Sequence, residues 1–296
     1  MGYFMAVILL VAYAVIMRSY YEIRTFDINR INICHKLASE REPVFIYLAD
    51  LHGMSFGPAN KRLMDSIEKI NPDAILIGGD LIVDKGKKFV GTTREKEVAV
   101  NFLNTLCEKY PVYYSFGNHE TRAKENPKLN AEFKNYLYRI KSKNLHILTN
   151  AHEYVTFKGT RFCIYGLETD LCNYKKRKPF IADRAYIEKC LGESPEHKYS
   201  IPIVLSHNPE NFEACAHWGA EYVFSGHNHG GIVRIPHFGG VISTSYRLFP
   251  KYDAGIFKSK NNNSTLILTR GLGTHTIKFR LFNKPELMVI TFKPKA

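Results

Sequence analysis

The first half of the chain alternates short apolar runs with amphipathic stretches. The apolar runs, rich in Val, Ile, Leu, Phe and Tyr, occupy residues 43–49, 73–77 and 112–116. The other stretches carry apolar side chains at helical spacing over residues 60–70, 93–110 and 129–143. Continuous apolar runs followed by amphipathic helices predict strands that are buried on both faces, with the helices covering the sheet.

The second half continues with strands in a different arrangement. Residues 154–165 predict a hairpin, and buried strands are expected over residues 201–206 and 222–225 with a short helix between them. Further strands are expected at residues 265–269 and 287–292. The whole pattern predicts an α/β fold in which two mixed β-sheets pack together and helices flank them.

The segment that precedes the first strand is apolar. Residues 2–17 contain no charged side chain, Arg18 ends the run, and two tyrosines follow at the depth of a membrane interface. We therefore predict a transmembrane anchor over residues 1–20, a polar connector over residues 21–42 and one domain over residues 43–296. A cleaved signal peptide is the alternative, although only the initiator Met stands where a basic segment would be expected.

Charge indicates the side of the membrane and the kind of partner. Basic residues follow the apolar run at positions 18, 24, 30, 36 and 41, which favours a domain on the cytoplasmic side of the cell membrane. The formal net charge of +13 indicates an anionic partner, either nucleic acid, anionic lipid or a phosphorylated small molecule. The six cysteines are widely spread, so we expect free thiols rather than disulfides or a zinc–thiolate site.

Polar side chains of metal-binding type stand at or just after the ends of five predicted strands. They are Asp50 and His52, Asp80, Asn118 and His119, His207, and His227 and His229. Ligands bind outside the carboxyl ends of strands in open α/β sheets, so the five loops are expected to meet at one place. Asp50 and His52 are two positions apart and can point to the same side of an extended chain.

The residue types in these loops suit a pair of divalent cations. Carboxylate and imidazole ligands accept Mn, Zn or Fe, and no cysteine is among them. Two cations about 3.5–4 Å apart can clamp the attacking and leaving oxygens of a displacement at phosphorus and lower the pKa of a bound water. The sequence therefore predicts a phosphoesterase with two divalent metal ions, of which Mn is favoured.

Five short motifs occur in a fixed order along the chain. They are D-L-H at 50–52, G-D at 79–80, G-N-H-E at 117–120, S-H-N-P at 206–209 and G-H-N-H at 226–229. In this order they resemble the calcineurin-like metallophosphoesterases over residues 43–296, which implies the four-layer αββα sandwich of that superfamily. The stretches L-F-P-K-Y and R-G-L-G-T are similar to its membrane-associated bacterial branch, some members of which hydrolyse the pyrophosphate of UDP-diacylglucosamine.

The resemblance implies a role for each of the eight residues. One metal would be held by Asp50, His52 and His229, and the second by Asn118, His207 and His227. Asp80 would bridge the two metals. His119 would be catalytic, because it would stabilise the developing charge or protonate the leaving oxygen.

Two departures from the family pattern concern residues beside these ligands. The Asp that often orients the catalytic His follows G-D, but Asp84 stands one position further along than usual and is given no role. Asn228 and Ile232 replace the Thr and Gln that are usual in this branch. We therefore expect the contacts with substrate to differ while metal binding is kept.

Each of three further features of the sequence allows two interpretations. The basic run Lys175–Lys178 is either a solvated loop or a lid that meets phosphate or anionic lipid. Residues 232–249 form either a packed hairpin or an apolar rim for an acyl chain. His275, in a Gly-rich turn, is either structural or close to the substrate.

We therefore predict a metal-dependent phosphoric ester hydrolase. The anchor, the basic charge and the apolar segment together favour attack by metal-bound hydroxide on a phosphodiester or pyrophosphate. The substrate is expected to be amphiphilic, lipid-linked or nucleotide-linked, and to be met at the membrane lipid. No specific nucleic acid is expected, since Tyr174 to Lys178 is the only stretch of the interleaved basic and aromatic kind. The alternatives are a phosphomonoesterase or nuclease on the same site, or a non-catalytic scaffold of the same fold.

Overall fold

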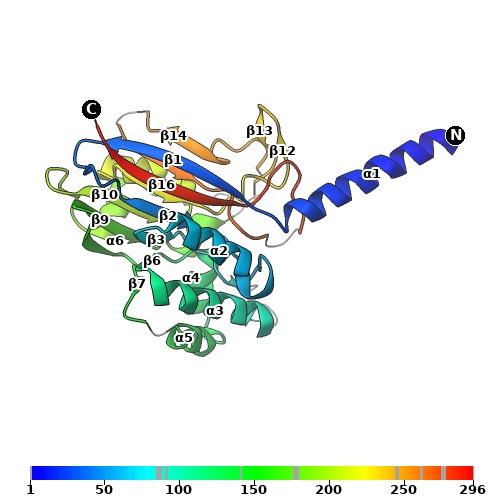
Figure 1. Ribbon diagram of the computed structural model, residues 1–296. Coiled ribbons are helices and arrows are strands. Elements are labelled where there is room, and N and C mark those ends of the chain that lie inside the picture. Colours follow the sequence, from blue (N-terminus) through cyan, green and yellow to red (C-terminus); the bar gives the residue numbers. More distant parts are fainter. Residues whose placement is uncertain are drawn as a thin grey trace.

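Two six-stranded β-sheets pack face to face at the centre of the molecule (Figure 1). The computed structural model describes residues 2–84, 89–90, 93–140, 142–175, 180–243, 247–260, 263–274 and 278–295. Aromatic and aliphatic side chains from both sheets, such as Phe45, Tyr47, Phe162 and Phe224, fill the space between them. Full burial of each such side chain stabilises the fold by about 1.5–3 kcal/mol.

The first sheet has the strand order β1-β16-β2-β3-β6-β7. Its strands are β1 (Asp27–His35), β16 (Glu286–Pro294), β2 (Val44–Leu48), β3 (Ala74–Ile77), β6 (Val112–Tyr114) and β7 (Leu145–Ile147). The last four strands are parallel to one another, and β16 runs antiparallel to β2 and parallel to β1. The carboxyl ends of β2, β3 and β6 therefore lie at the end of the sheet where β1 and β16 begin.

The second sheet has the strand order β14-β15-β11-β10-β9-β8. Its strands are β14 (Gly255–Lys258), β15 (Thr265–Leu268), β11 (Tyr222–Ser225), β10 (Ile201–Ser206), β9 (Thr160–Leu167) and β8 (Ala151–Phe157). The four inner strands are parallel and the two outer ones antiparallel. Two-stranded ribbons are formed by β4 (Val83–Asp84) with β5 (Phe89–Val90) and by β12 (Arg234–Ile235) with β13 (Gly239–Gly240).

Helices cover the outer face of each sheet, so the predicted four-layer sandwich is confirmed. The first sheet is covered by α2 (Lys61–Ile70), α3 (Thr93–Lys109), α4 (Asn118–Glu125) and α5 (Asn130–Tyr138), and the second by α6 (Arg184–Leu191) and α7 (Phe212–Trp218). Short 3₁₀ turns are η1 (Pro58–Asn60), η2 (Leu171–Tyr174) and η3 (Pro209–Asn211). The helical spacing of Leu63, Met64 and Ile67 buries all three against the first sheet. All six cysteines are free thiols, as predicted.

The segment 21–42 differs from the predicted polar connector, because it contains the edge strand β1. Ile31 and Ile33 are buried while the Asn and Cys residues that follow them are exposed, so the strand has one apolar and one polar face. It pairs with β16 along its whole length, from Asp27 opposite Glu286 to His35 opposite Pro294. The polar residues on the exposed face made this segment read as a connector in the sequence.

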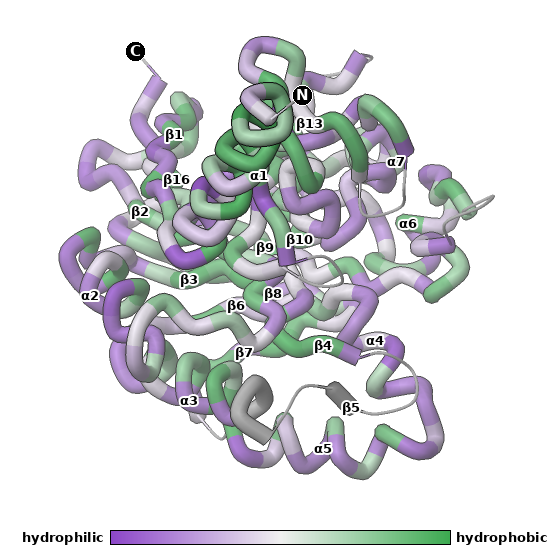
Figure 2. The backbone as a smooth tube through the Cα atoms, turned by 90° about the vertical axis from the view of Figure 1, so that its right-hand side faces the viewer, coloured by the Kyte–Doolittle hydropathy of each residue, from purple (hydrophilic) through white to green (hydrophobic). Residues whose placement is uncertain are grey.

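The first helix, α1 (Gly2–Glu22), projects away from the domain (Figure 1). It is apolar and long enough to cross a membrane, and only 6% of its most apolar 18 residues is buried. Figure 2, which looks nearly along the helix, shows hydrophobic segments on α1. The small buried share excludes a core helix, and an anchor and a signal sequence both fit these properties. Its last turns join the domain, where Ser19 and Glu22 are buried.

Candidate metal centre

The predicted site residues lie at the carboxyl ends of strands from both sheets. Loops after β2, β3 and β6 in the first sheet, and after β10 and β11 in the second, converge at the end of the sandwich from which α1 leaves. Three groups of side chains have their ligand atoms within 4.8 Å of one another: Asp50, His52 and His229; Asp80, His207 and His227; and His52, Asp80 and His119. Their role as metal ligands stays a prediction, but their geometry is that of one shared centre.

Asp80 stands where the groups meet. Its Oδ2 atom lies 3.1 Å from Nε2 of His207, 3.8 Å from Nε2 of His119 and 3.9 Å from Nε2 of His52. Asp50 occupies the corresponding place beside His229, whose Nε2 lies 3.4 Å from Asp50 Oδ1. A carboxylate with ring nitrogens on several sides has the position that a bridging ligand needs.

Five of these residues have left-handed backbone. They are Asp50 (φ 55°), His52 (φ 49°), Asp80 (φ 53°), His227 (φ 69°) and His229 (φ 51°). For residues other than glycine this conformation costs about 1–3 kcal/mol each and persists where surrounding structure fixes it. In this conformation the five side chains lie around one centre. The backbone strain lowers the free energy of unfolding, and the surrounding structure maintains it at the site.

Backbone carbonyl groups fix the orientation of four histidine rings. The Nδ1 atoms face the carbonyl oxygens of Gly78 (His207, 2.7 Å), Asp84 (His119, 2.9 Å), Gly273 (His229, 3.1 Å) and Ile82 (His52, 3.4 Å). We assign the proton to Nδ1 in His52 and His229, which leaves the lone pair of Nε2 directed to the centre. The Asp84 N–H also lies 2.8 Å from His119 Nδ1, so in His119 Nδ1 can accept and Nε2 can carry the proton. Asp84, which received no role from the sequence, thus positions His119 through its main chain.

Glu120 is a functional residue whose role the sequence did not reveal. Its buried carboxylate accepts hydrogen bonds from the backbone N–H groups of Asp80 (2.9 Å), Leu81 (2.8 Å) and Gly117 (3.0 Å), and from the Tyr114 hydroxyl (2.8 Å). In return, Asp80 Oδ1 accepts a hydrogen bond from the His119 N–H at 2.9 Å, in the first turn of α4. Glu120 therefore ties the loop of Asp80 to the loop of Asn118.

Arg280 and Asn283 support the centre from the C-terminal part of the chain. The buried Arg280 guanidinium donates hydrogen bonds to the carbonyl oxygens of Gly273 (2.7 Å) and Arg270 (2.8 Å). The Asn283 amide donates to the carbonyl of His229 at 2.8 Å. Burial lowers the pKa of Arg280 to about 10, which still leaves it charged at neutral pH. Both residues stand in the stretch R-L-F-N-K-P-E-L at 280–287, which is similar to the membrane-associated branch of the family, but only their tertiary contacts reveal what they do.

The electrostatics of the site favour cations. Burial, with a contribution from Asp80, raises the pKa of Asp50 to about 7. Burial also acts to raise the pKa of Asp80, but the charges of His207 and His119 outweigh it and bring that pKa well below its ordinary value. Burial and the neighbouring His207 lower the pKa of His227 to about 3. A neutral imidazole can donate its lone pair, and two buried carboxylates call for compensating positive charge.

Asn118 supplies a further sign that the residues fit metal ions. It is the first residue of α4, and its Oδ1 atom is buried without a hydrogen-bond partner in the described part of the chain. A buried amide oxygen without a partner costs about 1–3 kcal/mol. A divalent cation would satisfy it, and the set of carboxylate, amide and imidazole donors suits such an ion.

The other predicted features have varied outcomes. Asn228 is buried and donates to the Tyr252 carbonyl at 2.7 Å, so it fixes a loop. Tyr174, which sequence reasoning did not place in the site, has its ring 5.1 Å from that of His227, so the residue before the predicted lid lies at the centre. Lys176–Lys178 and His275 lie outside the described residues.

Comparison with known proteins shows similarity to phosphoesterases. A family model described as calcineurin-like phosphoesterase matches residues 43–231. The chain is 26% identical to phosphodiesterase YaeI of Escherichia coli over 87% of this chain and 86% of that one. It is 30% identical to the uncharacterized metallophosphoesterase YkuE of Bacillus subtilis over 79% of this chain and 72% of that one. A shorter match, 30% identical over 30% of this chain and 28% of the relative, is to UDP-2,3-diacylglucosamine pyrophosphatase LpxG of Chlamydia muridarum.

Proposed function

Since the chain belongs to the calcineurin-like phosphoesterase family and is a metal-dependent phosphoester hydrolase, we propose that it cleaves a phosphodiester or pyrophosphate bond in a lipid-linked or nucleotide-linked substrate. The names of two relatives, a phosphodiesterase and a UDP-2,3-diacylglucosamine pyrophosphatase, support this bond class. A pyrophosphate of the UDP-diacylglucosamine type is one such substrate.

The observation that carries the proposal is the position of the cluster relative to α1. Glu22, in the last turn of α1, accepts a hydrogen bond from the Asn283 N–H at 2.9 Å, and the Asn283 side chain holds the His229 carbonyl. One residue, Asn283, therefore connects the last turn of α1 to the backbone of a candidate metal ligand. An amphiphilic anion held in a membrane would meet the cluster at this end of the molecule.

We propose seven residues as the ligands of two divalent cations, with Mn the favoured metal. They are Asp50, His52 and His229 for one ion, Asn118, His207 and His227 for the other, and Asp80 between them. When bound, the cations supply Lewis acidity toward the phosphoryl oxygens and lower the pKa of a bound water. The chain itself contributes the fixed ring orientations and the buried, preorganised carboxylates.

His119 is the proposed acid of the reaction. Its Nδ1 atom is held by the Asp84 backbone, and its Nε2 atom lies 3.8 Å from Asp80 Oδ2. His119 is close enough to Asp80 and His52 to reach an ion, but it is not among the seven proposed ligands. From that place it can donate a proton to the leaving oxygen or stabilise the negative charge that develops there. The guanidinium of Arg122, which donates to the Asp84 carbonyl at 3.0 Å, adds positive charge beside it.

We propose that α1 is a single-pass membrane anchor and that the domain lies on the cytoplasmic side. The buried contacts of Ser19 and Glu22 support an uncleaved helix, because removal of α1 as a signal peptide would break them. The basic residues after the helix support the cytoplasmic side. Membrane lipid is then the second partner of the protein.

The proposed function is tested with full-length protein in detergent. Bis-p-nitrophenyl phosphate, p-nitrophenyl phosphate and UDP-2,3-diacylglucosamine are offered with Mn, Zn, Fe or Mg. We expect Mn-dependent turnover of the diester and the pyrophosphate above that of the monoester. The opposite preference would assign the site to phosphomonoesters.

Two substitutions separate the roles within the site. Asp80→Asn is expected to lower both metal content and turnover, whereas Asp65→Asn, an exposed partner of Lys61 on α2, changes neither. His119→Gln is expected to lower kcat by about 10²–10⁴-fold while the metal content stays that of the unsubstituted protein. Full activity of Asp80→Asn would show that the measured turnover does not come from this cluster. Absence of turnover in the unsubstituted protein with every metal would favour a scaffold.

A further inference from the structure

An apolar rim of exposed side chains lies beside the place where α1 leaves the domain. It consists of the side chains of Ile235, Phe238, Leu248, Phe249 and Phe282. Phe238 is 82% exposed, Leu248 68% and Phe249 63%, which are high values for large apolar side chains on a folded domain. Grouped exposed side chains of this kind mark a surface that meets a partner.

Contacts connect the rim to the base of α1. The Phe282 N–H donates to Glu22 at 3.1 Å, and the Arg18 guanidinium lies 5.7 Å from the centre of the Phe282 ring. The Arg234 N–H donates to the Leu281 carbonyl at 3.0 Å, so the β12–β13 ribbon is tied to the same segment. Figures 1 and 2 show this ribbon beside the base of the helix.

One part of the rim lines an open pocket of about 550 Å³. Ile235, Phe238 and Phe282 contribute apolar side chains to it, and Arg234, His237 and Asp253 contribute polar ones. Leu248 and Phe249 pair with the residues that follow the ribbon: Leu248 forms a β-bridge with Ile242, and the Phe249 N–H donates to the Val241 carbonyl at 2.9 Å. The backbone segments that bear the exposed apolar side chains are therefore hydrogen-bonded to one another.

Aromatic and basic side chains surround the same place. Tyr20 and Tyr21 are each about half exposed, and the Arg24 guanidinium lies 3.5 Å from the centre of the Tyr20 ring. Lys284 lies 5.5 Å from the centre of the Tyr21 ring. Tyrosine with Lys or Arg is the composition of a membrane–water interface, and the positive charge suits anionic headgroups.

The rim is also continuous with the metal centre. His229 precedes the ribbon by five residues, and the Asn283 side chain donates to the carbonyl groups of both His229 and Gly231. A surface in contact with the rim would therefore lie next to the candidate ligands.

We propose that the apolar rim is a second membrane contact, which docks the domain on the bilayer beside α1. The occupant is a lipid surface containing anionic headgroups, into which Phe238, Leu248 and Phe249 insert at the boundary of headgroups and acyl chains. The inference rests on the membrane anchor of the proposed function, whereas hydrolysis of a phosphoester plays no part in it. One helix leaves a domain free to tilt, and a second contact fixes which face meets the lipid.

Tryptophan fluorescence of the full-length chain in vesicles tests this docking. The chain has one Trp, Trp218, which is 1% exposed and gives a constant background. A second Trp is introduced as Phe238→Trp in the rim, as Tyr13→Trp in the middle of α1, or as Tyr199→Trp. Tyr199 precedes β10, at the opposite end of the sandwich, and is 59% exposed. The vesicles contain phosphatidylcholine with phosphatidylglycerol, with or without brominated acyl chains.

We expect brominated lipid to quench the Phe238→Trp signal at least about threefold more strongly than that of Tyr199→Trp, together with a blue shift of its emission. Equal quenching of these two variants, while Tyr13→Trp is quenched, would overturn the docking and leave the anchor intact. Absence of quenching at Tyr13→Trp would overturn the anchor, and the Phe238→Trp signal would still decide the rim. A blue shift at Phe238→Trp that brominated lipid does not quench would assign the rim to a second copy of the chain and overturn the proposal.

Discussion

The carboxylate of Glu120 accepts a hydrogen bond from the backbone N–H of Asp80, with 2.9 Å between N and Oε2, although 39 residues stand between them in the chain. The same carboxylate accepts from two more N–H groups of the Asp80 loop and from that of Gly117. The proposed bridging ligand thus has its position fixed by a residue that no metal would touch. Residues that orient metal ligands commonly change affinity without being ligands.

Glu120→Gln is expected to weaken metal binding by about 10–100-fold, because one amide oxygen cannot accept all the hydrogen bonds that two carboxylate oxygens accept. Stability should also fall by about 1–3 kcal/mol, since buried N–H groups lose their acceptor. Isothermal titration with Mn and thermal unfolding measure the two effects. Glu97→Gln is the control, because Glu97 pairs with Arg139 at the surface. An unchanged Mn affinity in Glu120→Gln would contradict the positioning role.

Gly226→Ala is expected to displace the carboxylate of Asp50, the second acidic residue of the site. A Cβ atom at Gly226 would lie 2.5 Å from Asp50 Oδ2 and 2.9 Å from the Cβ atom of Ala49, both of them fully buried. Asp50 must then move, and overpacking of this kind costs about 1–3 kcal/mol. We expect Mn content after dialysis to fall together with the melting temperature. A variant that melts lower but keeps its full Mn content would show that Asp50 is no ligand.

Chelation should lower the melting temperature of the unsubstituted protein. Cations that bind only the folded chain stabilise it by about 2.7 kcal/mol at a concentration a hundred times Kd. For a chain of this size, such a change shifts Tm by about 5–10 °C. Scanning calorimetry with EDTA and after re-addition of Mn measures the shift. In Asp80→Asn the shift should shrink to near zero, and a full shift in that variant would place the stabilising ion elsewhere.

Much of the site was predictable because its parts are local in sequence. Asp80 follows the apolar run Ala74–Ile77 after two glycines, and the carboxyl end of a parallel strand is where ligands bind in open α/β sheets. His119 was recognised through a motif that spans four residues.

What the sequence did not reveal depends on contacts between distant segments. The strand β1 is stabilised by pairing with β16 at the other end of the chain, and its alternating pattern alone resembles a polar linker. The family-like stretch at 280–287 gave Arg280 no role, because its role follows from the carbonyl groups of Arg270 and Gly273 in the loop after β15 and of His229 in the loop after β11. The place of Glu120 in a known motif was visible, but its acceptor role follows from the packing of α4 against the loop after β3.

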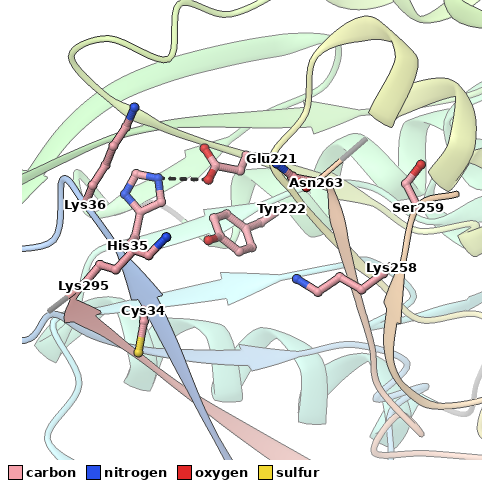
Figure 3. A pocket seen from close by; sticks show the side chains of 9 residues that line it. All are labelled: Cys34, His35, Lys36, Glu221, Tyr222, Lys258, Ser259, Asn263 and Lys295. Atoms are coloured by element: carbon pink, nitrogen blue, oxygen red, sulfur yellow. Dashed lines mark ion pairs between the residues drawn. The ribbon is translucent and has the colours of Figure 1, made fainter. Parts of the chain in front are cut away.

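At the opposite end of the sandwich, Glu221 should control stability in acid. Its carboxylate lies in a pocket of about 760 Å³ lined by three lysines and pairs with His35 at 2.9 Å (Figure 3). Burial acts to raise its pKa, but hydrogen bonds from His197 and His35 outweigh burial and lower the pKa to about 2. Because the folded pKa lies below the ordinary 4.5, this stabilisation is present above pH 4.5 and is lost as pH falls toward 2.

Glu221→Gln should therefore lower the free energy of unfolding by about 1–3 kcal/mol at pH 7. The difference from the unsubstituted protein should shrink as pH falls from 4.5 to about 2. Urea unfolding at pH 7, 4 and 3 gives the comparison, and Glu193→Gln, at an exposed position, is the control. A difference that is constant over this pH range would mean that packing and not the charge of Glu221 stabilises the pocket.

Glu22→Ala should show whether α1 is part of the catalytic domain's structure. The Glu22 carboxylate is fully buried and accepts hydrogen bonds from the N–H groups of Phe282 and Asn283 and from the Arg18 guanidinium at 2.6 Å. Truncation leaves these donors without their acceptor, at a cost of about 3–5 kcal/mol. Because Asn283 supports the His229 carbonyl, Mn affinity should fall as well. Glu40→Ala, at an exposed position after β1, is the matched control. If α1 only tethers the domain to the membrane, Glu22→Ala should have the Mn affinity and melting temperature of the control. If α1 is coupled to the site, the substitution should lower both.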